Sequence, residues 1–402
     1  CLLVWMPRET MSTSAISEKH RCEDLCDLHV PDTLMLGPGP SNVPPRVLAA
    51  MSINTIGHLH APFVGAMDDV QTLLRYVMQT DNQLTLGVTG SGAACMEACI
   101  VNLLQPGQTL LVVCNGYWGN RCTDVARRQG VLVEQVVGEW GTAVDPALIA
   151  ERVREVRPSA LFVTHGESST GVCQPLTGLG EACREVGALL IVDAVVTLGG
   201  VPLMMDEWKI DAMYSGAQKC LSSPPGLSPL SFGERAMEVL RTRDTKVASF
   251  YLDMLEVGKY WGSERKYHHT GSINNVYALR EGLRVVHEEG LQAAWDRHAS
   301  LAETLYDGLE KLGLELLVKK PEDRLAPLTT VRIPEGVDGK AVQAYMMNTF
   351  HIEIAGGLGD LAGKIWRIGL MGHNCQPRNV KLVLTALEEA LEVHGFFHRN
   401  HE

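Results

Sequence analysis

The chain has 402 residues and a formal net charge of -12 at pH 7, and its length favours two domains over a single core. Hydrophobic residues make up 46% of it and charged residues 20%, which is typical of a globular enzyme. The acidic balance argues against a nucleic-acid partner, because nucleic-acid-binding proteins usually present a basic face. No apolar stretch is long and continuous enough to predict a membrane-spanning helix. The 11 cysteines are scattered, without the paired spacing of a zinc site, so we expect no metal.

Three segments are predicted along the chain. Residues 1–31 have no hydrophobic periodicity and read as a polar N-terminal arm. Residues 32–289 are expected to form a large domain and residues 290–402 a smaller C-terminal one.

Short apolar runs alternate with helical patterns through most of the large domain. The runs that predict strands are Leu84–Thr89, Thr109–Cys114, Leu132–Val137, Ala160–Thr164, Leu189–Asp193 and Ala212–Ser215. Helical patterns between them include Ala94–Leu104, Asn120–Gln129 and Pro146–Val156. This alternation predicts an α/β domain with a mainly parallel sheet covered on both faces.

The pattern changes after about residue 275. One long helical stretch is predicted from Asn275 to about Leu312. Short predicted strands then alternate with helices, at Leu328–Ile333, Ile352–Ala355 and Lys364–Ile368. These elements predict a smaller α+β domain.

The first candidate site is the Gly90-Ser91-Gly92 turn, which follows a predicted strand and precedes a predicted helix. Free backbone N–H groups and the positive end of a helix dipole make such a turn an anion site. The alternative is a tight turn in which Ser91 only caps the helix.

Two further loops follow the ends of predicted strands, where side chains of a parallel sheet face a ligand crevice. Trp118 could stack on a flat ring there, or it could be a buried structural aromatic. Ser168 could bind a ligand or cap the next turn, and His165 is expected to be a hydrogen-bonded structural residue.

Asp193 and Lys219 give the strongest indication of chemistry. Asp193 ends an aliphatic strand, and a carboxylate there needs a partner. Lys219 lies in a loop crowded by glycine and proline, where burial and a nearby cation would lower its pKa. Pyridoxal phosphate needs a lysine for a Schiff base and a carboxylate for its ring nitrogen. The alternatives are a loop-capping aspartate and a surface lysine.

Arg367 lies in an apolar predicted strand of the smaller domain. Its guanidinium matches the two oxygens of a substrate carboxylate, although an internal salt bridge is an open alternative. Adjacent His268 and His269 do not face one way on a helix, so we expect no metal site there.

These residues lie in a chain that resembles the alanine–glyoxylate and serine–pyruvate aminotransferases, class V pyridoxal-phosphate enzymes of fold type I. The resemblance runs from about Leu34 to about Val393. Its motifs are MLGPGPSN at 35–42, FVTHGESSTGV at 162–172, SGAQK at 215–219, PPG at 224–226, SFYLD at 249–253, YHHT at 267–270 and RIGLMG at 367–372.

The resemblance implies a seven-stranded sheet and a role for each site residue. Lys219 and Asp193 would be catalytic, the first as the Schiff-base lysine and the second as the ring-nitrogen partner. Substrate would contact Gly39, Ser168 and Arg367. The implied cofactor-binding residues are Ser91, Gly92, Ala93, Trp118, Ser168, Asp193, Gln218, Lys219, Tyr267 and Thr270. Tyr267 and Thr270 would come from the other subunit of a homodimer. Many relatives have histidine at the position of Ala93, and we expect cofactor binding to survive this difference.

The implied reaction moves the amino group of alanine, or serine, to glyoxylate, with amino acids and 2-oxo acids as small-molecule partners. A 3-hydroxykynurenine transaminase is an alternative within the family. A cysteine desulfurase is less favoured, because those enzymes have histidines where this chain has Gln218 and Trp118. A protein of this fold without cofactor is disfavoured by the joint presence of Asp193, Lys219 and Arg367.

The resemblance favours a peroxisomal location linked to glyoxylate detoxification and glycine synthesis. Mitochondrion and cytosol stay open, because neither terminus carries a clear targeting signal. We expect the natural start at Met6 or Met11, since the given sequence begins with Cys1.

Overall fold

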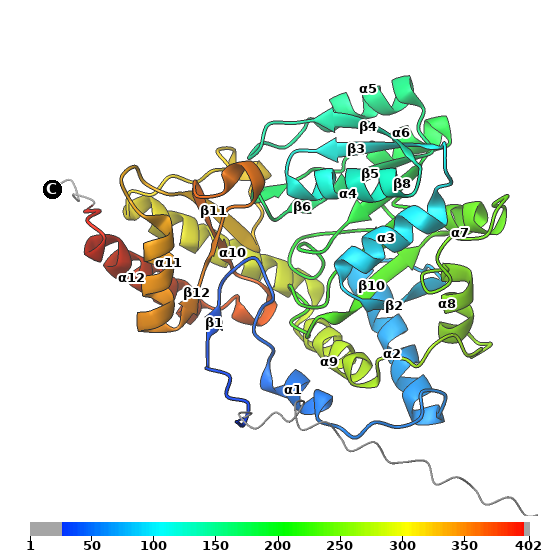
Figure 1. The fold of residues 1–402 in the computed structure, drawn as a ribbon, viewed down its shortest axis with the longest axis horizontal. Coiled ribbons are helices and arrows are strands. Elements are labelled where there is room, and N and C mark those ends of the chain that lie inside the picture. The colour runs from blue at the N-terminus through cyan, green and yellow to red at the C-terminus, as the bar shows by residue number, and fades with distance from the viewer. Residues whose placement is uncertain (1–25, 398–402) are drawn as a thin grey trace, which may run out of the picture. The chain divides into compact units, whose positions relative to one another are not determined.

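A seven-stranded β-sheet organises the larger part of the chain in the computed structural model, which describes residues 26–397 (Figure 1). Its strand order is β2-β10-β9-β8-β5-β3-β4. The strands are β2 (Leu84–Gly90), β3 (Thr109–Cys114), β4 (Leu132–Val137), β5 (Ala160–Thr164), β8 (Leu189–Asp193), β9 (Ala212–Tyr214) and β10 (Gly226–Phe232). Only β10 runs against its neighbours. The prediction of an α/β fold with a mainly parallel, seven-stranded sheet is therefore confirmed.

The central strands β5 and β8 are apolar up to their last residues, Thr164 and Asp193, because both faces of the sheet are covered. Every residue of β5 and of β8 is buried. The helices of this region are α1 (Pro45–Met51), α2 (Ala61–Met78), α3 (Gly92–Leu103), α4 (Tyr117–Arg128), α5 (Pro146–Val156), α6 (Leu179–Val186), α7 (Glu234–Arg241), α8 (Met254–Trp261) and α9 (Ile273–Glu289). A short hairpin of β6 (Gly166–Glu167) and β7 (Val172–Cys173) follows β5.

Strand β10 was not predicted from the sequence. Its residues Gly226, Ser228, Pro229 and Ser231 are unusual inside a sheet, because glycine and proline weaken strands and hydroxyls need partners. The serines are satisfied: Ser228 Oγ donates to the Gly90 carbonyl at 2.9 Å, and Ser231 Oγ lies 2.9 Å from Thr85 Oγ1.

The smaller C-terminal region packs helices against a three-stranded antiparallel sheet with the order β11-β14-β13. Figure 1 shows it in yellow to red beside the larger sheet. Its elements are α10 (Leu291–Lys311), β11 (Leu328–Arg332), α11 (Gly339–Phe350), β12 (Ile352–Glu353), β13 (Ala355–Gly356), β14 (Ile365–Gly369) and α12 (Pro377–Val393), with single 3-10 turns at Pro321–Asp323, Gly359–Leu361 and Gly372–Asn374. The two-residue strand β1 (Leu34–Met35) pairs with β12.

Two sequence predictions about this region need correction. The single helix expected from Asn275 to about Leu312 is two helices, because Gly290 adopts a positive φ of 86° between α9 and α10. The strand expected at Ile352–Ala355 is split into β12, which pairs with β1, and β13, which pairs with β14.

The domain boundaries stay predictions. The hydrophobic cluster around the large sheet extends as far as Trp295, and Leu36 packs with the C-terminal cluster. Most of the predicted arm, residues 1–25, lies outside the described residues, and residues 26–32 contain no helix or strand. Among residues 26–397 no helix is long and apolar enough to cross a membrane.

Candidate active site

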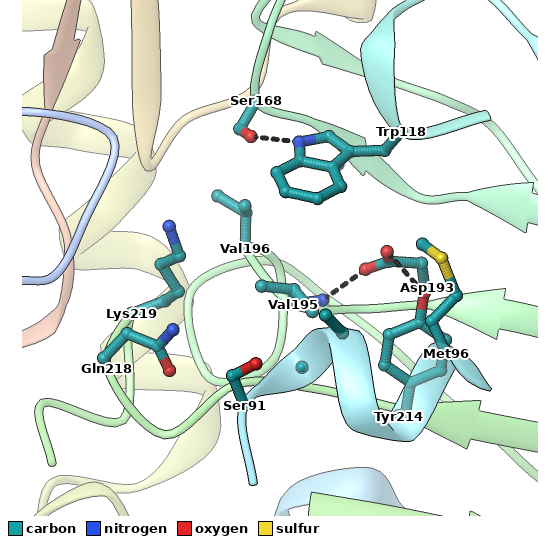
Figure 2. Close-up of a pocket in the computed structure, with 13 residues that line it drawn as sticks. Ser91, Met96, Trp118, Ser168, Asp193, Val195, Val196, Tyr214, Gln218 and Lys219 are labelled. Carbon is teal, nitrogen blue, oxygen red and sulfur yellow. Dashed lines mark hydrogen bonds between the residues drawn. The ribbon is translucent and has the colours of Figure 1, made fainter. Parts of the chain in front are cut away.

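A cavity lies at the carboxyl ends of the parallel strands and encloses about 580 Å³ of empty space (Figure 2). Strands β5 and β8 end there, side by side, with Thr164 paired to Asp193. The predicted site residues that line the cavity are Ser91, Gly92, Ala93, Trp118, Ser168, Asp193, Gln218 and Lys219. Ser91 and Lys219, which are 128 positions apart in the sequence, thus line the same cavity. The cavity lies at the edge of the sheet where α/β proteins bind ligands.

The N-terminus of α3 forms one wall of the cavity. Ser91 is the N-cap residue, yet its side chain makes no capping hydrogen bond, so its hydroxyl is available to a ligand. A side chain at Gly92 would approach Val195 Cγ2 to 2.9 Å, and glycine therefore lets the turn pack closely. Backbone N–H groups and the helix dipole make this wall suited to an anion such as a phosphate.

The indole of Trp118 forms the opposite wall, and this residue is held by one side-chain and one backbone hydrogen bond. Its Nε1 donates to Ser168 Oγ at 2.8 Å, as Figure 2 shows. Its backbone N–H donates to Glu167 Oε2 at 2.9 Å. An aromatic face held in this way can stack on a flat ligand ring.

Asp193 lines the cavity and is 4% exposed. Its Oδ1 accepts from the Val195 N–H at 2.9 Å, and its Oδ2 accepts from the Tyr214 hydroxyl at 2.7 Å (Figure 2). Burial raises the pKa of Asp193 to about 6, against the lowering effects of these two hydrogen bonds and of the Lys219 charge. A protonated pyridine nitrogen would give this carboxylate the cation that burial demands.

Lys219 faces the cavity from the loop after β9. Its Nζ donates to the Pro38 carbonyl. A side chain at Gly39, whose φ is 107°, would come within 2.5 Å of that nitrogen. Only glycine therefore lets the 38–40 loop lie against the lysine. Burial, and then the positive charge of Arg367, lower the pKa of Lys219 to about 8.

The lowered pKa of Lys219 predicts how the capture of the cofactor depends on pH. With a pKa of about 8, about one Lys219 in ten is a neutral, nucleophilic amine at pH 7, against fewer than about one in a thousand for free lysine. The rate at which apoprotein captures pyridoxal phosphate, followed by visible absorbance, should rise between pH 7 and 9 and level off above about pH 9. A rate that still rises steeply above pH 9.5 would show that the lysine has its ordinary pKa.

Arg367 lies on β14, in the smaller region, and reaches towards the Ser168 segment. Its Nε donates to the Gly356 carbonyl at 2.7 Å and its Nη1 to the Ser168 carbonyl at 3.2 Å. Burial lowers its pKa to about 10, against the raising effect of Glu167. No carboxylate among the described residues forms a salt bridge with it, so its charge is available to a substrate carboxylate.

Tyr267 and Thr270 do not line this cavity. Both are exposed, and Tyr267 keeps 60% of its accessible surface. Their expected place in a second subunit's site stays a prediction. His165 is buried, and its Nδ1 lies 3.0 Å from Thr197 Oγ1, as expected of a structural histidine.

Sequence reasoning assigned no role to Tyr214 or Glu167. Tyr214 bonds to Asp193 because β8 and β9 pair these two residues, a contact that depends on strand register. Glu167, in the β6–β7 hairpin, accepts a hydrogen bond from the Trp118 backbone N–H. The sequence feature that could have pointed to Glu167 is that it is the one acid in the stretch FVTHGESSTGV.

The cavity fits pyridoxal phosphate. Its lining includes a buried carboxylate without a salt-bridge cation among the described residues, the amine of the half-buried Lys219, and a helix N-terminus. The Gln218 Oε1 atom is buried in the cavity wall without a partner among the described residues, as expected for a group that awaits a ligand. The fold and this set of groups together define a pyridoxal-phosphate-dependent transferase.

The chain belongs to the class-V aminotransferase family. The family model described as "Aminotransferase class-V" matches residues 34–375. The chain is 45% identical to the alanine–glyoxylate aminotransferase of Callithrix jacchus over 368 residues, which are 91% of this chain and 89% of the relative. It is 38% identical to the (S)-ureidoglycine–glyoxylate transaminase of Bacillus subtilis over 387 residues, 92% of this chain and 93% of that one.

The solved structures agree with this assignment. The crystal structure of an alanine–glyoxylate aminotransferase from Nostoc sp. superposes with a TM-score of 0.90 at 50% sequence identity, covering 91% of this chain and 97% of that chain. The chain is therefore an aminotransferase that uses pyridoxal phosphate.

Proposed function

We propose that this enzyme transfers the amino group of L-alanine, or of L-serine, to glyoxylate, giving glycine and pyruvate or hydroxypyruvate. The observation that carries the proposal is the shared cavity of Lys219 and Asp193, with Ser168 in its wall and Arg367 bonded to the Ser168 carbonyl. The amine and the proposed ring-nitrogen partner line one cavity, and the proposed carboxylate anchor Arg367 adjoins it through its hydrogen bond to the Ser168 carbonyl. The similarity to alanine–glyoxylate aminotransferases supports this choice of substrates.

Pyridoxal phosphate supplies an electrophilic carbon for the substrate amine and a ring that accepts electrons from the substrate Cα. In the proposed arrangement, Arg367 binds the substrate carboxylate through its guanidinium, and the Ser168 hydroxyl lies beside it. Lys219 Nζ, once free, takes the proton from the substrate Cα and later returns it. Its lowered pKa suits both transfers near neutral pH.

Each wall has a separate proposed task. Trp118 would stack on the cofactor ring and Asp193 would keep the ring nitrogen protonated. Ser91, Gly92 and Ala93 would hold the phosphate through backbone N–H groups and the Ser91 hydroxyl, so a histidine at position 93 is not required. Gln218 would make a further polar contact.

We also propose a homodimer with shared sites. Tyr267, Phe250 and Tyr251 keep 60%, 68% and 43% of their surface exposed, an aromatic surface that a second copy could cover. Tyr267 and Thr270 would then reach the partner's phosphate turn. Light scattering of the holoenzyme would measure the mass of the assembly.

A substrate panel tests the choice of donor. We expect kcat/KM with glyoxylate to be highest for alanine or serine and at least about tenfold lower for 3-hydroxykynurenine and (S)-ureidoglycine. A tenfold difference corresponds to about 1.4 kcal/mol in transition-state binding. A preference for either of the larger donors would replace the proposed substrate within the same family. Release of sulfide from cysteine would instead indicate a desulfurase.

A further inference from the structure

Glu167 is a fully buried acid beside the active site for which the proposed reaction has no task. It is 0% exposed and ends the short strand β6. No lysine, arginine or histidine among the described residues forms a salt bridge with it. A buried carboxylate of this kind is costly unless several donors satisfy it.

Three donors do so. Oε1 accepts from the Ser169 N–H at 3.0 Å and from the Ser169 hydroxyl at 2.6 Å, and Oε2 accepts from the Trp118 N–H at 2.9 Å. The Tyr117 N–H donates to Ser169 Oγ at 2.9 Å. Glu167 and Ser169 therefore bind the first two N–H groups of α4, which is the task of an N-cap.

The helix cannot supply this cap itself. Its own N-cap residue is Gly116, which has no side chain to offer. A side chain there would collide with the Glu167 side chain. The space next to α4 is thus filled by the side chain of an acid from a distant segment, whose oxygen accepts from the first turn of the helix.

The capped turn also touches the proposed substrate anchor. Ser168, between Glu167 and Ser169, accepts from Trp118 Nε1 through its hydroxyl and from Arg367 Nη1 through its carbonyl. Trp118 is therefore held to this turn at both its backbone and its ring. Loss of the backbone bond would release one of the two hydrogen bonds that join Trp118 to this turn.

We propose that Glu167 is a positioning residue that fixes the Trp118 indole against the cofactor ring by binding the Trp118 backbone N–H. This inference rests on the proposed function, in which Trp118 stacks on the cofactor. A carboxylate is needed because it accepts on both sides at once. In a glutamine whose carbonyl oxygen accepts from Ser169, the NH₂ group would face the Trp118 N–H. Two donors would then face each other.

The experiment measures pyridoxal phosphate binding to the full-length apoprotein, so it does not depend on the substrate. We expect Glu167→Gln to raise the dissociation constant of the cofactor about tenfold and to change the circular dichroism of the bound cofactor. Thr170→Val is the matched control, because it removes a buried hydroxyl of the same turn, which donates only to the Glu167 carbonyl at 3.5 Å. Its dissociation constant should stay within about twofold of wild type.

A double-mutant cycle shows whether Glu167 acts through Trp118. In the Trp118→Ala background, Glu167→Gln should change the dissociation constant by less than about twofold, because the ring that it positions is gone. Equal effects of Glu167→Gln in both backgrounds would overturn the proposal, as would unchanged affinity and dichroism in the single variant. If the Glu167→Gln protein does not fold, Glu167→Asp replaces it and is measured against the same criteria. The aspartate side chain is too short to bond to Ser169 and reach the Trp118 N–H at the same time. Failure of the wild-type protein to bind cofactor would count against the proposed function instead.

Discussion

The Lys219→Ala protein should lose the transamination rate by at least about 10³-fold and lose the visible absorbance of lysine-bound cofactor. The variant has neither the amine that binds the cofactor covalently nor the group that moves the Cα proton, and each contribution is large. The environment explains why no other group replaces it. Lys219 is the only lysine that lines the described cavity, and its pKa is lowered to about 8 by burial and Arg367.

Two measurements separate loss of chemistry from loss of fold. Lys381→Ala, an exposed lysine on α12, should keep full activity and the absorbance band. The Lys219→Ala protein should keep its far-ultraviolet circular dichroism. A Lys219→Ala protein that retains both its absorbance band and more than about a tenth of its activity would move the covalent role to another residue.

The Asp193→Asn protein should show a fall in kcat of about 10²- to 10³-fold. Asparagine carries no negative charge to keep the cofactor's ring nitrogen protonated, so the ring would accept electrons less well. The expected fall corresponds to about 3–4 kcal/mol of lost transition-state stabilisation. Asparagine has nearly the same shape and can still accept from the Val195 N–H. The change therefore removes the negative charge while leaving the loop after β8 largely in place.

The fall should appear in kcat more than in KM for the amino acid, because Asp193 lies away from the proposed carboxylate anchor, Arg367. Steady-state kinetics over a range of alanine concentrations separates the two constants. Asp206→Asn serves as control, since Asp206 also accepts hydrogen bonds, from Thr80 and Asp81, but does not line the cavity. Equal kcat values for Asp193→Asn and wild type would contradict the proposed role.

The sequence was sufficient to predict the residues whose signal is local. Asp193 follows four aliphatic residues, Gly92 lies in a turn between a strand and a helix, and Lys219 lies in a loop rich in glycine and proline. The paired strand ends then bring these residues together, as parallel-sheet geometry requires.

Residues that act through long-range contacts could not be predicted. The bond from Tyr214 to Asp193 depends on the register of β8 and β9. The cap that Glu167 places on α4 joins two segments 49 positions apart. Strand β10 was missed because Pro229 and its serines suit a sheet only where partners such as Gly90 and Thr85 are in place.

Tracing the amino group itself tests the proposed transfer from alanine to glyoxylate most directly. Holoenzyme is incubated with glyoxylate and with alanine whose nitrogen is isotopically labelled, and the products are measured by mass spectrometry. We expect labelled glycine and pyruvate in equal amounts, and no labelled glycine from the Lys219→Ala protein. Pyruvate without labelled glycine, or no transfer from alanine or serine by a protein that carries its cofactor, would contradict the proposed transfer.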